Sequence, residues 1–189
     1  MARYLILAVQ VRKNRNPFRP LSFIDLGHVD IILWAPPGRP QAFGFYSRPA
    51  SMFRVFISAF KSQPAQMIRS RYFTRCPAYW RPWEISASGF EATKEYLEQT
   101  AEGCTEGSVL YDAVHFNCLH LAHRCLQLAG LNPPAIPTKR VWFVNTPIPD
   151  SFIEVLMPGA RHSVMYHDLG RRPPEESLAA MRRFWQSHE

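Results

Sequence analysis

The stretch "FNCLHLAHRC", residues 116–125, decides how the chain is interpreted, because it places a cysteine at the start of an apolar helical pattern. From Cys118 onward, apolar residues recur at i, i+3, i+4, i+7, i+10 and i+11, which is typical of one helix face. The face consists of Cys118, Leu121, Ala122, Cys125, Leu128 and Ala129. Asn117 suits the N-cap position, and Gly130 followed by prolines suits the end of the helix. We therefore expect a helix that begins at Cys118.

The position of Cys118 can be interpreted in two ways. Unpaired backbone N–H groups and the positive end of the helix dipole stabilise an anion at a helix N-terminus. A thiol in such a place has a lowered pKa, and its thiolate is the reactive form. The same N–H groups can stabilise the oxyanion of an attacked carbonyl. Free cysteine is also among the most buried residue types, so the spacing leaves a nucleophile and a core side chain both open. Cys125, two turns further along, is expected to be core.

A histidine is the candidate base. His28 interrupts the aliphatic run "LGHVDIIL" at residues 26–33, and a buried imidazole needs a polar partner. The runs at 21–35 and 40–48 flank "PPGR", which predicts a β-hairpin over residues 21–48. A cysteine at a helix start facing a histidine on a strand is the papain type of arrangement, which is recognised by geometry rather than by order. A core histidine is the alternative reading.

The group that orients the histidine is less well defined. If Pro37 and Gly38 form the turn, His28 pairs with about residue 47, which makes Ser47 the expected third catalytic residue. Gln41 is a more distant polar candidate. Asp30 lies two residues along on the same strand face and is a further one.

The remaining pattern predicts an α+β fold, with strands first and helices later. Residues 3–11 favour a strand, and residues 49–82 favour an irregular excursion with one strand near 52–57. "WEISASGFEATKEYLEQTAEG" (83–103) predicts a helix capped at Ser86 or Ser88 and stopped by Gly103.

The C-terminal part carries two more helical patterns. Residues 145–156 favour a short helix, and residues 173–187 a final amphipathic helix. We expect a catalytic domain over 1–157 and an extension over 158–189 that packs on it. With 189 residues, 47% of them hydrophobic, the chain is long enough for one domain with a sizeable core.

Composition limits the location and the partners. No apolar run approaches the roughly 18 residues of a transmembrane helix, and the opening lacks the features of a secretory signal. We expect a chain made as a soluble cytosolic protein, whose export into a target cell would need a carrier. The formal charge is +7, which favours an anionic partner. The basic residues form no stripe with interleaved aromatics, so we expect no nucleic-acid binding.

The spacing of the cysteines predicts no bound metal, and we expect no cofactor. They stand at 76, 104, 118 and 125, without CxxC spacing or a dense disulfide framework. The sequence does not decide whether Cys76 and Cys104 form a disulfide. A zinc site from His115, Cys118, His120 and Cys125 would need ligands from opposite sides of one helix, and the usual spacings are missing. His120 and His123 fall away from the apolar face, and we expect them to be solvated.

Two stretches of the chain resemble those of a known family. "LGHVDIILWAPPGRPQAFGFYS" (26–47) resembles the histidine hairpin of the permuted papain-like cysteine hydrolases, and "YDAVHFNCLHLAHRCLQLAGLNPP" (111–134) resembles their "Y…NC" helix with its exit. This branch includes the lecithin-retinol acyltransferase group and several bacterial cell-wall hydrolases and interbacterial toxins. Residues 83–99 also resemble the strand and helix that precede the nucleophile in bacterial members. The similar stretches cover somewhat over a third of the chain.

The resemblance implies a permuted papain-like fold, with an antiparallel sheet packed against the helix that carries the nucleophile. It implies Cys118 as nucleophile and His28 as general base, acting on an amide through a thioester. A departure is that the return strand offers Ser47 and no second histidine or acidic residue at the matching place.

The function implied is a bacterial cell-wall peptidase or amidase, or a secreted antibacterial effector, with a peptide or polymeric substrate and an immunity or carrier protein as partner. Alternatives on the same fold are an acyltransferase, a lipid hydrolase or a protein deamidase. A non-catalytic cationic binding module is the alternative outside enzymes.

Overall fold

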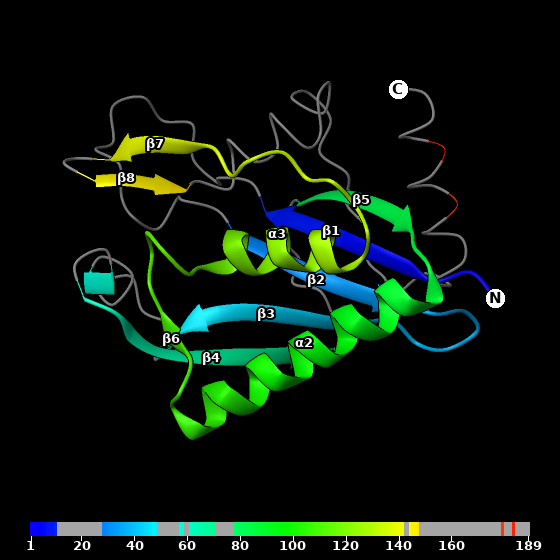
Figure 1. Cartoon of the computed structure of the whole chain (residues 1–189), viewed down its shortest axis with the longest axis horizontal. Coiled ribbons are helices and arrows are strands. Elements are labelled where there is room, and N and C mark those ends of the chain that lie inside the picture. The colour runs from blue at the N-terminus through cyan, green and yellow to red at the C-terminus, as the bar shows by residue number, and fades with distance from the viewer. Residues whose placement is uncertain are drawn as a thin grey trace.

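The structure is a computed structural model, and it describes residues 1–10, 28–48, 57–58, 61–70, 78–141, 144–147, 179 and 183. In this part of the chain a six-stranded antiparallel sheet carries two helices, so the expected α+β class is confirmed (Figure 1). The strands of the sheet are β1 (Tyr4–Gln10), β2 (His28–Trp34), β3 (Gln41–Ser47), β4 (Gln63–Ser70), β5 (Ala78–Glu84) and β6 (Leu110–Tyr111), in the order β5-β1-β2-β3-β4-β6. β7 (Thr138–Val141) and β8 (Val144–Pro147) form a separate pair.

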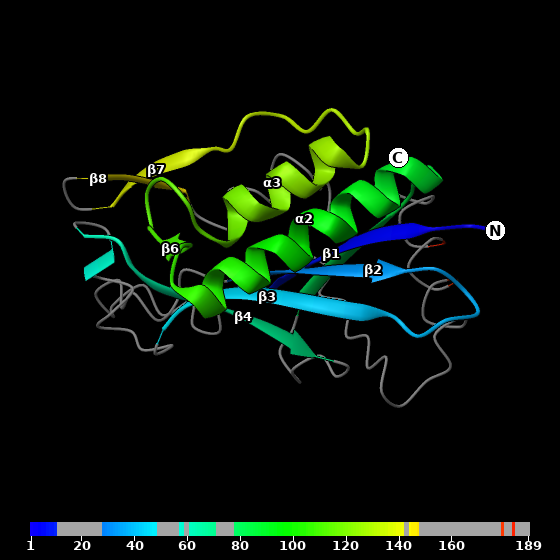
Figure 2. The ribbon, with the colours of Figure 1, turned by 60° about the horizontal axis from the view of Figure 1, so that its bottom comes forward.

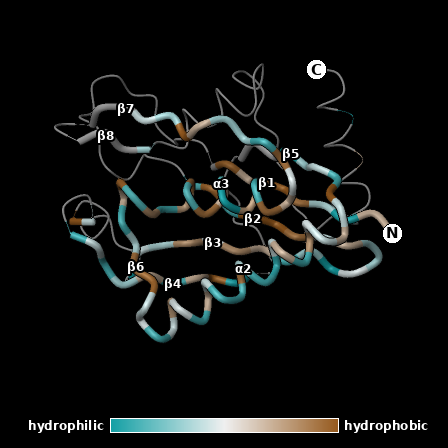
Figure 3. Tube along the Cα trace, in the orientation of Figure 1, coloured by the Kyte–Doolittle hydropathy of each residue, from teal (hydrophilic) through white to brown (hydrophobic). Residues whose placement is uncertain are grey.

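Both helices, α2 (Ala87–Glu106) and α3 (Cys118–Leu128), lie on one face of the sheet (Figure 2). Because side chains alternate along a strand, β1 and β2 each send every second residue to this face. There Leu5, Leu7, Val29 and Ile31 share a core with α3, and all are at most 1% exposed. Figure 3 shows the hydrophobic residues concentrated along these two strands.

The opposite face of the sheet has its own buried cluster. It consists of Tyr4, Ile6, Ala8, Ile32, Trp34 and Ala42. In the alternation of β2, His28 and Asp30 belong to the same set as Ile32 and Trp34, whereas Val29 and Ile31 belong to the helix face. His28 is the first residue of β2, so it stands at one end of the sheet.

Local sequence explains where α2 begins and ends. The side chain of Ser86 accepts a hydrogen bond from Gly89 N–H at 3.0 Å, as an N-cap does. The helix ends at Glu106, before Gly107 with φ of 80°, so the expected stop at Gly103 was wrong. Gly103 lies inside the helix. A Cβ there would lie 2.6 Å from Cγ2 of Val109, so glycine at this position lets the following loop pack closely on the helix.

Two strands in the region 49–82 contradict the expected irregular excursion. β4 and β5 both contain proline and few aliphatic residues, which hides the alternation of a strand. β5 forms one edge of the sheet, and prolines are tolerated in edge strands. The strand expected near 52–57 falls almost wholly outside the described residues.

The C-terminal expectations are tested only in part. Residues 144–147 form strand β8, so the short helix expected over 145–156 was wrong at its start, and its remainder lies outside the described residues. Ala179 and Arg183 are helical, in agreement with the final helix, but the rest of 158–189 also lies outside them. No helix in the described part of the chain is long and apolar enough to cross a membrane.

Candidate active site

The start of α3 meets the start of β2. Cys118 is the first residue of α3 and is 5% exposed. Its thiol lies close enough to the imidazole of His28, the first residue of β2, to raise the pKa of that ring. Two residues that are 90 positions apart in the sequence are therefore in contact.

A carboxylate completes this contact. Nε2 of His28 lies 3.1 Å from Oδ1 of Asp30, and both side chains are largely buried, with exposed fractions of 13% and 11%. Since Nε2 is engaged with Asp30, Nδ1 is the ring nitrogen left for the thiol. The arrangement is a thiol, an imidazole and a carboxylate in series, and a carboxylate at the second ring nitrogen fixes the orientation of the ring.

The electrostatics favour a protonated imidazole. Burial lowers the pKa of His28, but the negative charge of a Cys118 thiolate and the hydrogen bonds to Asp30 and Cys118 together raise it to about 10. An imidazolium with this pKa keeps its proton at neutral pH. The contact between the two side chains suits proton exchange between the Cys118 thiol and the His28 imidazole, which a cysteine nucleophile requires.

Two residues of β3 surround the pair of His28 and Asp30. The ring of Tyr46 stacks on the imidazole, with ring centroids 4.1 Å apart and an interplanar angle of 16°. The Tyr46 hydroxyl also donates a long hydrogen bond of 3.5 Å to Oδ1 of Asp30. Gly44 pairs with Asp30 across the sheet and has no side chain to separate the carboxylate from Tyr46.

The register of the hairpin explains why Ser47 lies elsewhere. Asp30 pairs with Gly44 and Leu33 with Gln41, so the same register continued by two residues sets Tyr46 opposite His28. The expected pairing with residue 47 was one residue off, because the turn is centred on Pro37 rather than between Pro37 and Gly38. A shift of one residue moves a side chain to the other face of a strand.

Neither of the two other predicted polar groups contacts the imidazole. Ser47 is 2% exposed, and its hydroxyl has no hydrogen-bond partner within the described structure. Gln41 is exposed at the far end of β3, opposite Leu33. Of the three candidates from the sequence, only Asp30 lies against His28.

Asn117 builds the helix start that carries the thiol. Its side-chain oxygen accepts hydrogen bonds from Leu119 N–H at 2.9 Å and His120 N–H at 3.4 Å, and its amide donates to the carbonyl oxygen of Ala113 at 2.7 Å. Asn117 is itself buried, so these bonds are shielded from water. They fix the backbone on both sides of Cys118.

His120 is part of this cap, and the expectation that it is solvated was wrong. Its Nδ1 accepts a hydrogen bond from the backbone N–H of Asn117 at 3.3 Å, which makes a reciprocal capping box. Burial, followed by the neighbouring His115 and His123, lowers the pKa of His120. A neutral imidazole retains the acceptor that this bond needs.

Tyr111 shares the buried core with Cys118. It is 8% exposed and packs on Phe45, with ring centroids 5.4 Å apart. Burial and then the nearby charges of Cys118 and Tyr46 raise its pKa well above the usual value. Its phenol therefore stays neutral beside Cys118.

The other described cysteines lack an imidazole partner. Cys125 is fully buried, and burial raises its pKa, in agreement with the expected core role. Cys104 is a free thiol whose pKa burial raises to about 11. Cys76 lies outside the described residues, so a bond between it and Cys104 is not visible. Within the described segments no three His, Cys, Asp or Glu side chains gather as metal ligands.

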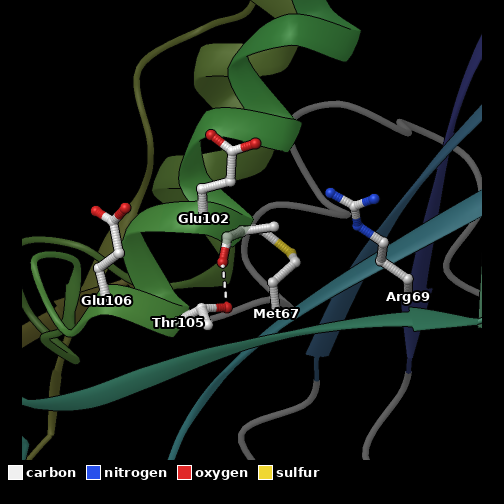
Figure 4. Close-up of a pocket in the computed structure, with 6 residues that line it drawn as sticks. Met67, Arg69, Glu102, Thr105 and Glu106 are labelled. Atoms are coloured by element: carbon white, nitrogen blue, oxygen red, sulfur yellow. Dashed lines mark hydrogen bonds between the residues drawn. The ribbon is translucent and has the colours of Figure 1, made fainter.

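A separate hollow of about 480 Å³ lies between β4 and the C-terminal half of α2. Figure 4 shows Glu102 and Glu106 on the helix side and Arg69 on the strand side. None of the residues that line it belongs to the contact between Cys118 and His28.

The sequence predicted Cys118 and His28 as site residues and offered Asp30 as a further candidate. It did not indicate Tyr46 or Gly44. A signal for them was present in "FGFYS", since a glycine inside a strand often marks a close approach of another group. The residue that approaches could not be identified without the register.

Comparisons with known proteins add little. No protein-family model and no curated protein matches the chain. A crystal structure of the type VI secretion system effector TseH is similar over 83% of this chain and 89% of that chain, with 15% sequence identity and a TM-score of 0.49. A likeness at this level shows neither the family nor the activity of this chain.

Proposed function

We propose that this chain is a cysteine hydrolase that cleaves an amide bond through a thioester. The observation that carries the proposal is the series of contacts from the Cys118 thiol to the His28 imidazole and on to the Asp30 carboxylate. A buried histidine that only filled space would need one polar partner. This histidine has a carboxylate and a thiol, which are the two partners that a cysteine hydrolase requires.

The reaction follows from these contacts. The Cys118 thiolate attacks the amide carbonyl carbon, so a C–S bond forms and the carbonyl oxygen becomes an oxyanion. The C–N bond then breaks as the His28 imidazolium gives its proton to the leaving amine. The imidazole next takes a proton from water, which attacks the thioester and releases the acid and the thiolate. Asp30 holds the ring in place through both steps.

The helix start supplies a donor for the oxyanion. The side chain of Asn117 occupies the N–H groups of Leu119 and His120. Among the described residues, no acceptor takes the N–H of Cys118 itself. This N–H lies on the attacking residue, and a backbone donor so placed stabilises an oxyanion as it forms.

The substrate that we favour is a peptide of the bacterial cell wall, which agrees with the resemblance seen in the sequence. The chain carries a formal charge of +7, so a polymer with negative charge would be attracted to it. Such an enzyme would act as an antibacterial effector in a target cell, and the producing cell would need an immunity protein against it.

Expression in bacteria tests the proposal. The wild type, Cys118→Ala and the control Cys125→Ala would be produced separately in the cytoplasm and, with an added export signal, in the periplasm. We expect lysis from the periplasmic wild type and from Cys125→Ala, but none from Cys118→Ala. Purified wild type should also release peptide fragments from isolated cell walls.

Other outcomes change or end the proposal. Toxicity confined to the cytoplasm would contradict the cell-wall substrate and direct the search to proteins or lipids. Full toxicity and wall cleavage by a folded Cys118→Ala variant would contradict the hydrolase itself.

A further inference from the structure

We infer that Tyr46 is a positioning residue of this site, whose ring holds the His28 imidazolium in place while its hydroxyl holds Asp30. The inference rests on the proposed function, because it concerns the same imidazole. It assigns a role to a residue whose known contacts are with the imidazole and the carboxylate.

The geometry of the stack is the first argument. The rings of Tyr46 and His28 have centroids 4.1 Å apart and are tilted by only 16°, which is face-to-face packing. Two neutral rings prefer an offset or edge-on arrangement, because their faces both carry partial negative charge. A cation over a ring face is attracted instead. The Tyr46 ring is thus placed so that its face can attract a protonated His28.

The hydroxyl of Tyr46 supplies the second argument. It lies 3.5 Å from Oδ1 of Asp30, the same oxygen that Nε2 of His28 approaches to 3.1 Å. One side chain of β3 thus contacts both members of the imidazole–carboxylate pair. Rotation of the imidazole away from Asp30 would break the stack as well as the hydrogen bond.

Gly44 makes this packing possible. A Cβ at position 44 would lie 2.6 Å from Oδ1 of Asp30, 2.6 Å from Cε2 of Tyr46 and 3.0 Å from its hydroxyl oxygen. Such distances are far below van der Waals contact, so any side chain at Gly44 would displace the carboxylate and the ring. The sheet thus has a gap in its side-chain layer that Asp30 and Tyr46 fill.

The groups that face His28 set the expected size of the effect. Asp30 faces it from its own strand, Cys118 from α3 and Tyr46 from β3. Tyr111 of β6 lies near Cys118 and Tyr46, and its raised pKa keeps it neutral. Of these groups, Tyr46 alone contributes a ring face.

The experiment measures the pKa of His28 directly. Histidine labelled with ¹³C in the ring would be followed by NMR against pH, and His28→Gln would assign the signal. The variants are Tyr46→Phe, which keeps the ring, and Tyr46→Leu, which removes it. Tyr4→Leu is the matched control, because Tyr4 packs on Trp34 at the other end of the β1–β2 pair.

We expect Tyr46→Leu to lower the pKa of His28 by roughly half a unit or more, which is the size of a partly buried cation–π contact. Tyr46→Phe should keep most of the wild-type pKa, and Tyr4→Leu should not change it. Gly44→Ala, which keeps the ring but displaces it, should give a shift in the same direction as Tyr46→Leu.

Two results would overturn the inference. One is a folded Tyr46→Leu variant with the wild-type pKa of His28, and the other is a Tyr46→Phe variant that loses as much as Tyr46→Leu. The proposed function fails in a different way. A wild-type His28 that titrates near 6.5, with no change in Cys118→Ala, would show that the thiolate–imidazolium pair does not exist.

Discussion

Nε2 of His28 lies 3.1 Å from Oδ1 of Asp30, which is two residues further along the same strand. The orienting carboxylate therefore comes from the strand that carries the histidine and not from the return strand of the hairpin. The hydrogen bond that orients the imidazole thus lies within β2, and Tyr46 of β3 packs against it. This placement also makes Asp30 the side chain whose hydrogen bond should orient the imidazole.

Asp30→Asn tests this role. The amide keeps the size of the carboxylate but loses its charge, so the pKa of His28 should fall and the ring should be held less firmly. We expect the rate of hydrolysis to fall about 10-fold or more while the protein stays folded. The rate and the His28 titration are the measurements. Glu95→Gln, which removes an exposed carboxylate from α2, is the control and should change neither.

Ser47→Ala separates the two candidates for the orienting group. The Ser47 hydroxyl is buried without a partner in the described structure, and an unsatisfied buried hydroxyl costs about 1–3 kcal/mol. We expect Ser47→Ala to retain activity and to raise the free energy of unfolding in urea by up to about 1 kcal/mol. A loss of activity comparable to that of Asp30→Asn would show that Ser47 takes part in catalysis.

The stability of the protein should depend on pH through His28. Its pKa is raised from 6.5 to about 10 on folding, so the folded state binds more protons than the unfolded state between these values. The stabilisation is fully present below pH 6.5 and is lost as the pH rises towards 10. The contribution of His28 to the free energy of unfolding should therefore fall over this window.

Cys118→Ala removes the charge that is the largest contribution to the raised pKa of His28. The slope of stability between pH 6.5 and 10 should therefore become shallower in this variant than in the wild type. An equal slope in the two proteins would mean that another group causes the pH dependence.

The cap of α3 should affect both stability and the thiol. Asn117→Ala removes the hydrogen bonds to Leu119 and His120 and leaves the carbonyl oxygen of Ala113 without its donor. We expect a loss of about 1–2 kcal/mol in the free energy of unfolding and slower alkylation of Cys118. Ser86→Ala, which removes the cap of α2, should cost about 1 kcal/mol without changing the thiol. Unchanged alkylation of Cys118 in Asn117→Ala would show that the cap does not affect the reactivity of the thiol.

The sequence predicted those parts of the fold that depend on local pattern. The helix that begins at Cys118, its cap at Asn117 and the hairpin around Pro37 all follow from spacing and from turn residues. β4 and β5 could not be found in this way, because their prolines and polar residues hide the alternation of a strand, and only their pairing with neighbouring strands reveals them. That pairing is a property of the folded sheet.

The site shows the same division. Cys118 and His28 could be named because each is chemically out of place in an apolar segment. The choice between Ser47 and Asp30 depended on a register shift of one residue, which the turn "PPGR" does not specify. The role of Tyr46 depended on the register and on the missing side chain at Gly44 together, so it emerged only in three dimensions.

Thiol alkylation, resolved by cysteine, tests the central claim most directly. Cys104 is the internal control, because its exposed fraction of 5% equals that of Cys118 but burial raises its pKa to about 11. At pH 6, where an isolated thiol is protonated, iodoacetamide should modify Cys118 at least about 10-fold faster than Cys104, and His28→Gln should remove this difference. Equal rates at Cys118 and Cys104 in the wild type, measured by peptide mass spectrometry, would contradict the paired thiolate and imidazolium.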